Sequence, residues 1–196
     1  MIFDLLSETV SWERWEGTIE YTFMSPASRA TQLIGTSIYA ITYGVIRTAF
    51  IFGIISLFFD MDLSEANYLS AVVILVICSI SLVGFGMVAA VMPLLSPEKG
   101  QQVTSIFTAL LLLVAGVYYS IDVLPGWMQQ IARFSPVKYA LDGMRAALLD
   151  GKGVSELWPS IWPLLIMGAI LVPAGLLIFR AGERYAKRTG LLKRSG

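Results

Sequence analysis

Few side chains in this sequence of 196 residues could take part in chemistry, and the most regularly spaced are three glutamates, Glu13, Glu16 and Glu20. Read as one helix, they lie at positions i, i+3 and i+7, so their carboxylates would form a single stripe. Apolar residues of the same spacing would form a neighbouring stripe; they are Trp12, Trp15, Ile19 and Phe23. An acidic helix is poorly suited to an anionic inner leaflet. This pattern therefore predicts a helix at a membrane surface that offers carboxylates to a protein partner.

The remaining composition excludes several kinds of catalytic site within this chain. It has no histidine, and its one cysteine, Cys78, lies in an apolar run, so a Ser-His-Asp triad, a Cys-His pair and a histidine-based zinc site are excluded. No G-x-x-x-x-G-K-[ST] motif occurs, so the chain has no P-loop for nucleotide hydrolysis. We expect no catalytic residue, no bound metal and no cofactor on this chain, and we expect that it is not an enzyme.

The amino-acid balance is that of a membrane protein. The chain is 56% apolar and 14% charged, whereas soluble domains carry about 25% charged residues. Segments of roughly 20 apolar residues can cross the bilayer, and four are predicted, over about 33–59, 68–92, 103–119 and 157–179, the third being short. Basic and acidic residues number 14 each, and this zero net charge indicates no nucleic-acid partner.

The distribution of charge predicts the orientation. Residues 180–196 form a basic tail with six Lys and Arg residues and one acid. By the positive-inside rule this tail is cytoplasmic, and an even number of spans places residues 1–32 in the cytoplasm too. We therefore expect a multi-pass protein of the cytoplasmic (inner) membrane with both termini inside. The loop over 120–156 would lie outside although it carries four cations, which is the weak point of this orientation.

The outer loop is predicted to hold two short amphipathic helices over about 125–150. Trp127, Ile131 and Phe134 follow helical spacing before Pro136, and a second apolar series follows it. Pro136 separates the two because proline lacks the N–H that a helix interior requires. These helices would lie at the outer interface or re-enter the membrane. A folded extracellular cap without a transport role is the alternative.

A few positions inside the spans could belong to a substrate pathway. Arg47 is the only charge within a span, and it would contact an anionic substrate or a carboxylate from a span that this sequence does not contain, or would simply snorkel outward or bond to a backbone carbonyl oxygen. In the third span Leu112, Leu113 and Gly116 could line a central pathway at a dimer axis. The leucines could equally face lipid.

Two stretches resemble the ABC type-2 permeases, the membrane subunits of many ATP-driven exporters. The run "ERWEGTIEYTFMSPASRATQLIG" resembles their cytoplasmic signature, E-G-T-[LI]-E followed by Ser-Pro, with Glu16, Gly17, Thr18, Ile19, Glu20, Ser25 and Pro26 matching. The run "LPGWMQQIARFSPVKYALDGMRAALLDG" resembles the outer loop of that family, with matches at Leu124, Pro125, Trp127, Pro136, Tyr139 and Arg145. The two stretches lie on opposite sides of the membrane, in the order that the family requires.

This resemblance implies an all-α polytopic fold and a role as the permease subunit of an ABC exporter. The segment from Glu13 would be a coupling helix that docks on a separate ATPase subunit, which binds the ATP and Mg, and the permease would work as a dimer with a second copy or a related permease. Independently of the resemblance, apolar spans with few polar groups favour a hydrophobic or amphipathic cargo over a sugar or a free ion.

The resemblance also raises a question about the number of spans. Members of the family usually have six, two of them before the signature, so these two would be absent here or supplied by another chain. A non-transporting scaffold, or an accessory half-permease that regulates a full transporter, is the alternative function.

Overall fold

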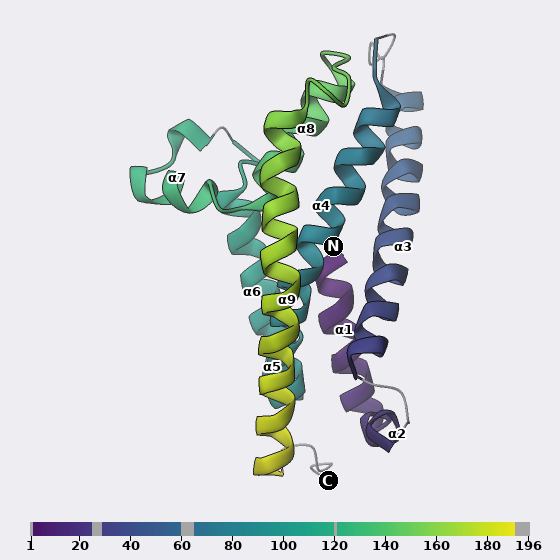
Figure 1. Cartoon of the computed structure of the whole chain (residues 1–196), viewed down its shortest axis with the longest axis vertical. Helices are drawn as coiled ribbons and strands as arrows, with labels where there is room; N and C mark the ends of the chain where they lie inside the picture. Colours follow the sequence, from purple (N-terminus) through teal and green to yellow (C-terminus); the bar gives the residue numbers. More distant parts are fainter. Residues whose placement is uncertain (1, 25–28, 60–64, 120, 191–196) are drawn as a thin grey trace. The chain divides into compact units, whose positions relative to one another are not determined.

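A computed structural model describes residues 2–24, 29–59, 65–119 and 121–190, and within these ranges every regular element is a helix. The α-helices are α1 (Ile2–Glu16), α2 (Ile19–Met24), α3 (Arg29–Phe58), α4 (Tyr68–Ala89), α5 (Val91–Leu95), α6 (Pro97–Val114), α7 (Gly126–Ala132), α8 (Pro136–Leu148) and α9 (Trp158–Thr189), with a 3-10 turn, η1, at Ile121–Val123 (Figure 1). The prediction of an all-α polytopic membrane protein is confirmed.

Three stretches of the described chain are long and apolar enough to cross a membrane: Thr31–Phe58, Tyr68–Leu95 and Trp158–Thr189. The prediction for the third span was wrong at its end. Its helix stops at Val114, and the apolar part, Gln102–Val114, covers only about 20 Å at 1.5 Å per residue. The chain turns at Gly116, whose φ of 73° is a left-handed conformation that glycine adopts without the Cβ penalty.

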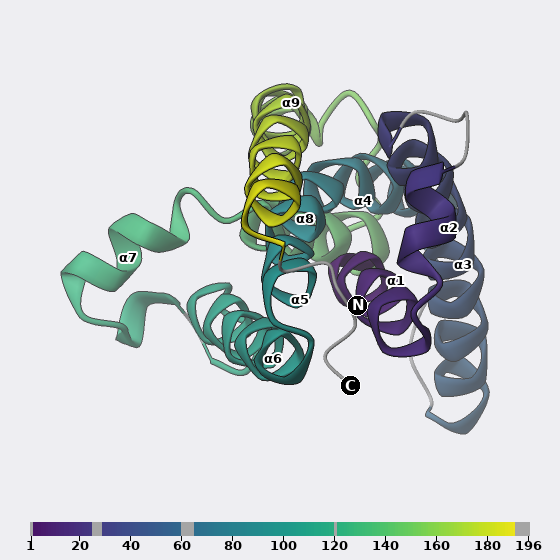
Figure 2. The ribbon, with the colours of Figure 1, turned by 90° about the horizontal axis from the view of Figure 1, so that it is seen from below.

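Residues 1–40, 82–109 and 170–196 form one compact unit. In it α1 packs against α5 and buries Leu6 and Val10. Figure 2 shows α1 in purple beside α5. Buried Leu94 and Phe179, from α5 and α9, belong to the core of the same unit.

Residues 41–81 and 110–169 form the second unit. Its core joins α4, α8 and the beginning of α9 through Ala71, Ile74, Ala147, Leu157 and Ile161. The backbone N–H of Asn67 donates to the carbonyl oxygen of Ala147 at 2.9 Å, which fixes the start of α4 against the end of α8.

The two predicted outer helices are present as α7 and α8. They are separated as expected, because Pro136 occupies the first turn of α8, where its missing N–H is harmless. Ser135 and Pro136 are both buried, so this break is packed into the second unit.

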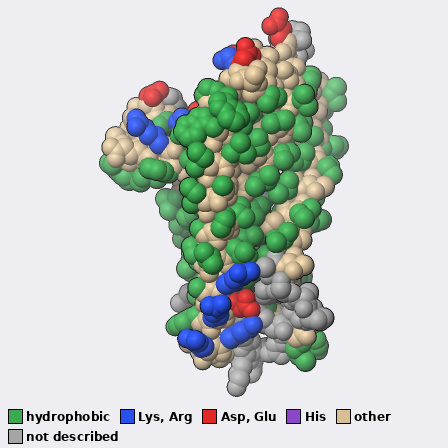
Figure 3. Space-filling model, in the orientation of Figure 1, with side chains coloured by type: hydrophobic (Ala, Val, Ile, Leu, Met, Phe, Trp, Pro, Cys, Tyr) green, Lys and Arg blue, Asp and Glu red, His purple; other side chains and the backbone are tan. Residues whose placement is uncertain are grey.

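The basic tail predicted over 180–196 is helical as far as Thr189, because α9 continues beyond the apolar span. Its Lys187 Nζ lies 2.7 Å from Glu183 Oε1, an i to i+4 pair that supports the helix. Figure 3 shows Lys and Arg side chains gathered at this end of α9. The cations of the tail thus follow a continuous helix out of the apolar segment.

Candidate functional site

The predicted coupling helix is two helices with a corner between them. α1 ends at Glu16, Gly17 has a φ of 74°, and α2 begins at Ile19. The single stripe predicted for Glu13, Glu16 and Glu20 is therefore wrong, because the helix breaks between the second and third glutamates. A glycine just beyond the last helical residue commonly ends a helix in this conformation.

Side chains around this corner are divided between one anchor and several exposed groups. Ile19 is 2% exposed, whereas Trp15 is 76%, Tyr21 76% and Met24 82% exposed. The carboxylate of Glu16 is exposed beside them. We call this turn, with its buried anchor and its exposed side chains, the coupling corner; it comprises Trp15, Glu16, Gly17, Thr18, Ile19, Tyr21 and Met24. Of the other predicted coupling residues, Ser25, Pro26 and the side chain of Glu20 lie outside the described part.

Glu13 is used differently from Glu16. Its side chain is half-buried, and Gln32 Nε2 donates to Glu13 Oε1 at 2.6 Å, which ties the end of α1 to the beginning of α3. The hydroxyl of Thr18 donates to the main-chain carbonyl oxygen of Glu13 at 3.4 Å, so it satisfies a carbonyl in the last turn of α1. The structure therefore places Glu13 within the fold and Glu16 at its surface.

A second set of polar contacts joins α1 to α6 and was missed from the sequence. The hydroxyls of Ser7 and Thr104 are 2.8 Å apart and buried. One turn further along α6, the hydroxyl of Thr108 donates to Asp4 Oδ1 at 2.7 Å. The signal was the i, i+4 spacing of two threonines in an apolar helix, since such residues commonly bond across helix interfaces in membranes.

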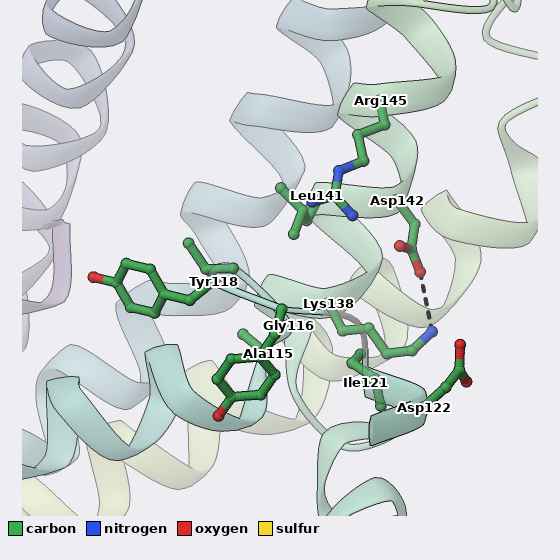
Figure 4. Close-up of a pocket in the computed structure, with 11 residues that line it drawn as sticks. Ala115, Gly116, Tyr118, Ile121, Asp122, Lys138, Leu141, Asp142 and Arg145 are labelled. Carbon is green, nitrogen blue, oxygen red and sulfur yellow. Dashed lines mark hydrogen bonds and ion pairs between the residues drawn. The ribbon is translucent and has the colours of Figure 1, made fainter. Parts of the chain in front are cut away.

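Residues 115–119 and parts of the predicted outer loop line an open pocket of about 490 Å³ in the second unit (Figure 4). Its lining includes Gly116, Tyr118, Ile121 and Leu141, with Asp122, Lys138, Asp142 and Arg145 as the charged groups. Lys138 Nζ lies 3.0 Å from Asp142 Oδ2 and 5.0 Å from the centre of the Tyr139 ring. Two cations and two carboxylates balance, so the charges of this pocket favour neither anions nor cations.

Three of the other residues predicted for the outer loop lie at or just before the start of α7, away from the pocket. Leu124 and Pro125 precede α7, where Pro125 is its N-cap, and Trp127 on α7 is 64% exposed. The side-chain amide of Gln129 donates to the carbonyl oxygen of Leu124 at 2.9 Å and holds this turn. Of the six predicted residues, only Arg145 lines the pocket.

The predicted pathway residues are dispersed along the second unit. Leu112 is half-buried and Leu113 is 40% exposed, and the carbonyl oxygen of Leu113 accepts a hydrogen bond from the hydroxyl of Tyr119 at 2.8 Å. Arg47 lies exposed on α3 and makes no hydrogen bond or ion pair with any residue that the structure describes.

Comparisons with known proteins bear on this arrangement. The chain is 24% identical over 176 residues to the probable multidrug ABC transporter permease YbhR of Escherichia coli K12, an alignment that covers 89% of this chain and 47% of the relative. It is 33% identical over 113 residues to the linearmycin resistance permease protein LnrN of Bacillus subtilis, covering 57% of this chain and 29% of that relative. The chain thus spans about half the length, or less, of these curated relatives. No solved structure matches it.

The family comparison covers most of the chain. The model of the ABC-2 type transporter family matches residues 1–149, a region that contains both the coupling corner and helices α7 and α8. The chain therefore belongs to the ABC-2 type transporter family.

Proposed function

We propose that this chain is a permease subunit of an ABC exporter and that its coupling corner docks on a separate ATPase subunit, which binds ATP and Mg. The observation that carries the proposal is the division of roles at the corner. Ile19 is buried and fixes α2 to the fold, while Trp15, Tyr21 and Met24 project outward beside the carboxylate of Glu16. Aromatic groups at the centre of an interface supply much of its binding energy.

The route from this corner into the spans supports coupling. α1 is joined to α6 through Ser7 and Thr104 and to the start of α3 through Glu13 and Gln32. A displacement of the corner would therefore act on two apolar helices through buried or half-buried hydrogen bonds. ATP-driven closure of the ATPase dimer would move the corner, and the spans would alternate between inner and outer access.

The proposed orientation places the corner and both termini in the cytoplasm. α1, α2 and the basic end of α9 belong to the same compact unit, and Arg180, Arg184, Lys187 and Arg188 follow the last apolar span. The positive-inside rule favours the cytoplasm for that end. In a bacterium this would be the inner membrane.

The proposed cargo is a hydrophobic or amphipathic molecule, and the transporter would work as a dimer of permease copies or related permeases. The names of the two relatives, a probable multidrug permease and a linearmycin resistance permease, support efflux of this class of compound. The apolar spans of this chain, whose mean hydropathy reaches 2.7 in Tyr68–Leu95, agree with such a cargo.

The test is charge reversal at the corner, Glu16→Lys, in the transporter complex purified in mild detergent. Loss of a desolvated charge pair costs on the order of 2–5 kcal/mol. The yield of recovered ATPase should therefore fall by a factor of at least about 30. Glu8→Lys is the matched control, because Glu8 is an exposed acid on the same helix, two turns from the corner. Recovery of a P-loop ATPase with the control, and its loss with Glu16→Lys, is the expected result.

Transport of a fluorescent amphipathic compound from cells gives the second measurement. Glu16→Lys should abolish efflux while the protein level in the membrane stays unchanged. If Glu16→Lys retains both its ATPase and its efflux, the corner is not the coupling site. If no ATPase accompanies the unaltered chain and no efflux occurs, the scaffold or accessory role is the better description.

A further inference from the structure

Arg47 places a charge on an apolar face of α3 that nothing in the described chain covers. At 3.6 residues per turn, the neighbours of Arg47 on this face are Phe50, Ile51, Ile54 and Phe58. All are exposed; Phe50 is 69% and Phe58 is 82% exposed. We call Arg47 and these four apolar residues the Arg47 face. The opposite side of this part of α3, with Val45, Phe52 and Ser56, is half-buried.

The position of Arg47 within the span makes direct exposure to lipid unfavourable. It lies eleven residues before Phe58, about 16 Å from that end of the helix, and farther from Thr31 at the other end. Snorkelling serves Lys and Arg residues near the ends of a span, and Arg47 is near neither end.

The direction of the helix makes snorkelling harder still. Every Cα–Cβ bond in an α-helix tilts toward the N-terminus. The side chain of Arg47 therefore starts toward the more distant end of α3 and away from the nearer surface. An intramembrane arginine in this position needs an acceptor at its own depth.

The spans of this chain offer no carboxylate for that purpose. The ranges 31–58, 68–95, 102–114 and 158–179 contain neither Asp nor Glu. A symmetric contact between two copies through this face would bring two Arg47 side chains together, which like charges oppose. Charge complementarity thus excludes a second copy and selects a different membrane helix.

We propose that the Arg47 face is an interface for a transmembrane helix from outside this chain, and that this helix carries an Asp or Glu at the depth of Arg47. The wide apolar part of the face supplies van der Waals packing, and the Arg47 guanidinium pairs with the carboxylate. In hydrocarbon such a pair also determines the register of the two helices, because either charge alone would be unsatisfied. The proposed interface does not depend on which compound the transporter moves.

The first test is photo-crosslinking in the cells that make this protein. p-Benzoylphenylalanine replaces Phe50, and the linked peptide is identified by mass spectrometry. The expected product links position 50 to a transmembrane helix from outside this chain. That helix should carry an Asp or Glu within one turn of the linked residue. Linkage to a second copy of this chain, or to no protein, would overturn the proposal. Ile170, 62% exposed on α9, is the comparison position and should not link to the same helix.

The second test uses charge. Arg47→Gln removes the charge at nearly constant length, and the yield of the linked product should fall about 30-fold or more, while Arg47→Lys keeps most of it. Arg47→Asp combined with the partner's acid changed to Arg should restore the product, although each single change removes it. Equal yields in Arg47→Gln and in Thr48→Gln, a control beside the face, would contradict a charge pair. Levels of the inserted protein show whether the variants fold, and removal of a charge should not hinder insertion.

Discussion

Gly84 on α4 and Gly175 on α9 lie in backbone contact. A Cβ atom on Gly175 would collide with the carbonyl oxygen of Gly84, and a Cβ atom on Gly84 would collide with the backbone carbonyl of Leu171. Small residues let membrane helices approach closely and gain van der Waals contact. The two most hydropathic of the candidate spans in the described chain are therefore packed at a point where only glycine fits.

Gly84→Ala should destabilise this helix contact. Overpacking costs typically 1–3 kcal/mol, and at about 2–4 °C per kcal/mol it should lower the unfolding midpoint by several degrees. The chain contains its own probe, since Cys78 is its single cysteine and is 8% exposed, so a thiol-reactive fluorophore reports thermal opening. Gly53→Ala is the control, because a Cβ there meets nothing within 4 Å. An unchanged midpoint for Gly84→Ala would show that the helices can separate freely.

The Ser7–Thr104 hydrogen bond should contribute measurably to the attachment of α1. A buried hydrogen bond contributes about 0.5–1.5 kcal/mol, and a double-mutant cycle of Ser7→Ala and Thr104→Ala should return a coupling energy in that range. Thr104 also donates to the carbonyl oxygen of Gly100, so its own single substitution should cost more than that of Ser7. Strictly additive effects of the two substitutions would mean that the bond contributes nothing.

The long apolar elements could be predicted from the sequence, but the turns that end them could not. The lengths of the apolar runs were sufficient to predict helices α3, α4 and α9. Pro136 was sufficient to predict the division between α7 and α8. The apolar residues after Val114 continue the hydropathy of the third span, so only the backbone conformation of Gly116 shows that the helix has ended. Hydropathy measures transfer free energy and carries no signal for a single left-handed residue.

The coupling corner shows the same limit at the candidate site. Glutamate, threonine and isoleucine around Gly17 are all compatible with a helix, and the i, i+3, i+7 spacing suggested one stripe. Whether a glycine lies inside a helix or ends it depends on tertiary packing, here the burial of Ile19. The Glu13–Gln32 hydrogen bond links residues on two helices across a connecting segment, and no local pattern predicts such a pair.

Gly17→Ala should strain the corner without removing any side-chain contact. A left-handed conformation costs an alanine roughly 1–2 kcal/mol relative to glycine. We expect a lower unfolding midpoint, or a straightened corner with weaker ATPase recovery if α1 and α2 merge into one helix. Gly35→Ala is the matched control: it lies inside α3 with open space at the Cβ position, and it should be neutral or stabilising. Full stability together with full ATPase recovery in Gly17→Ala would show that the left-handed turn is dispensable.

Cysteine labelling should establish the orientation on which the coupling argument depends. In a Cys78→Ala background, Ser155→Cys in the exposed turn before α9 should react with a membrane-impermeant maleimide added to intact cells. Thr189→Cys at the basic end of α9 should react only after the membrane is permeabilised, because the positive-inside rule places that end in the cytoplasm. Both positions are exposed, so accessibility within the fold does not limit either reaction. Rapid labelling of Thr189→Cys in intact cells would reverse the orientation, and the coupling corner would then lie on the wrong side of the membrane to meet an ATPase.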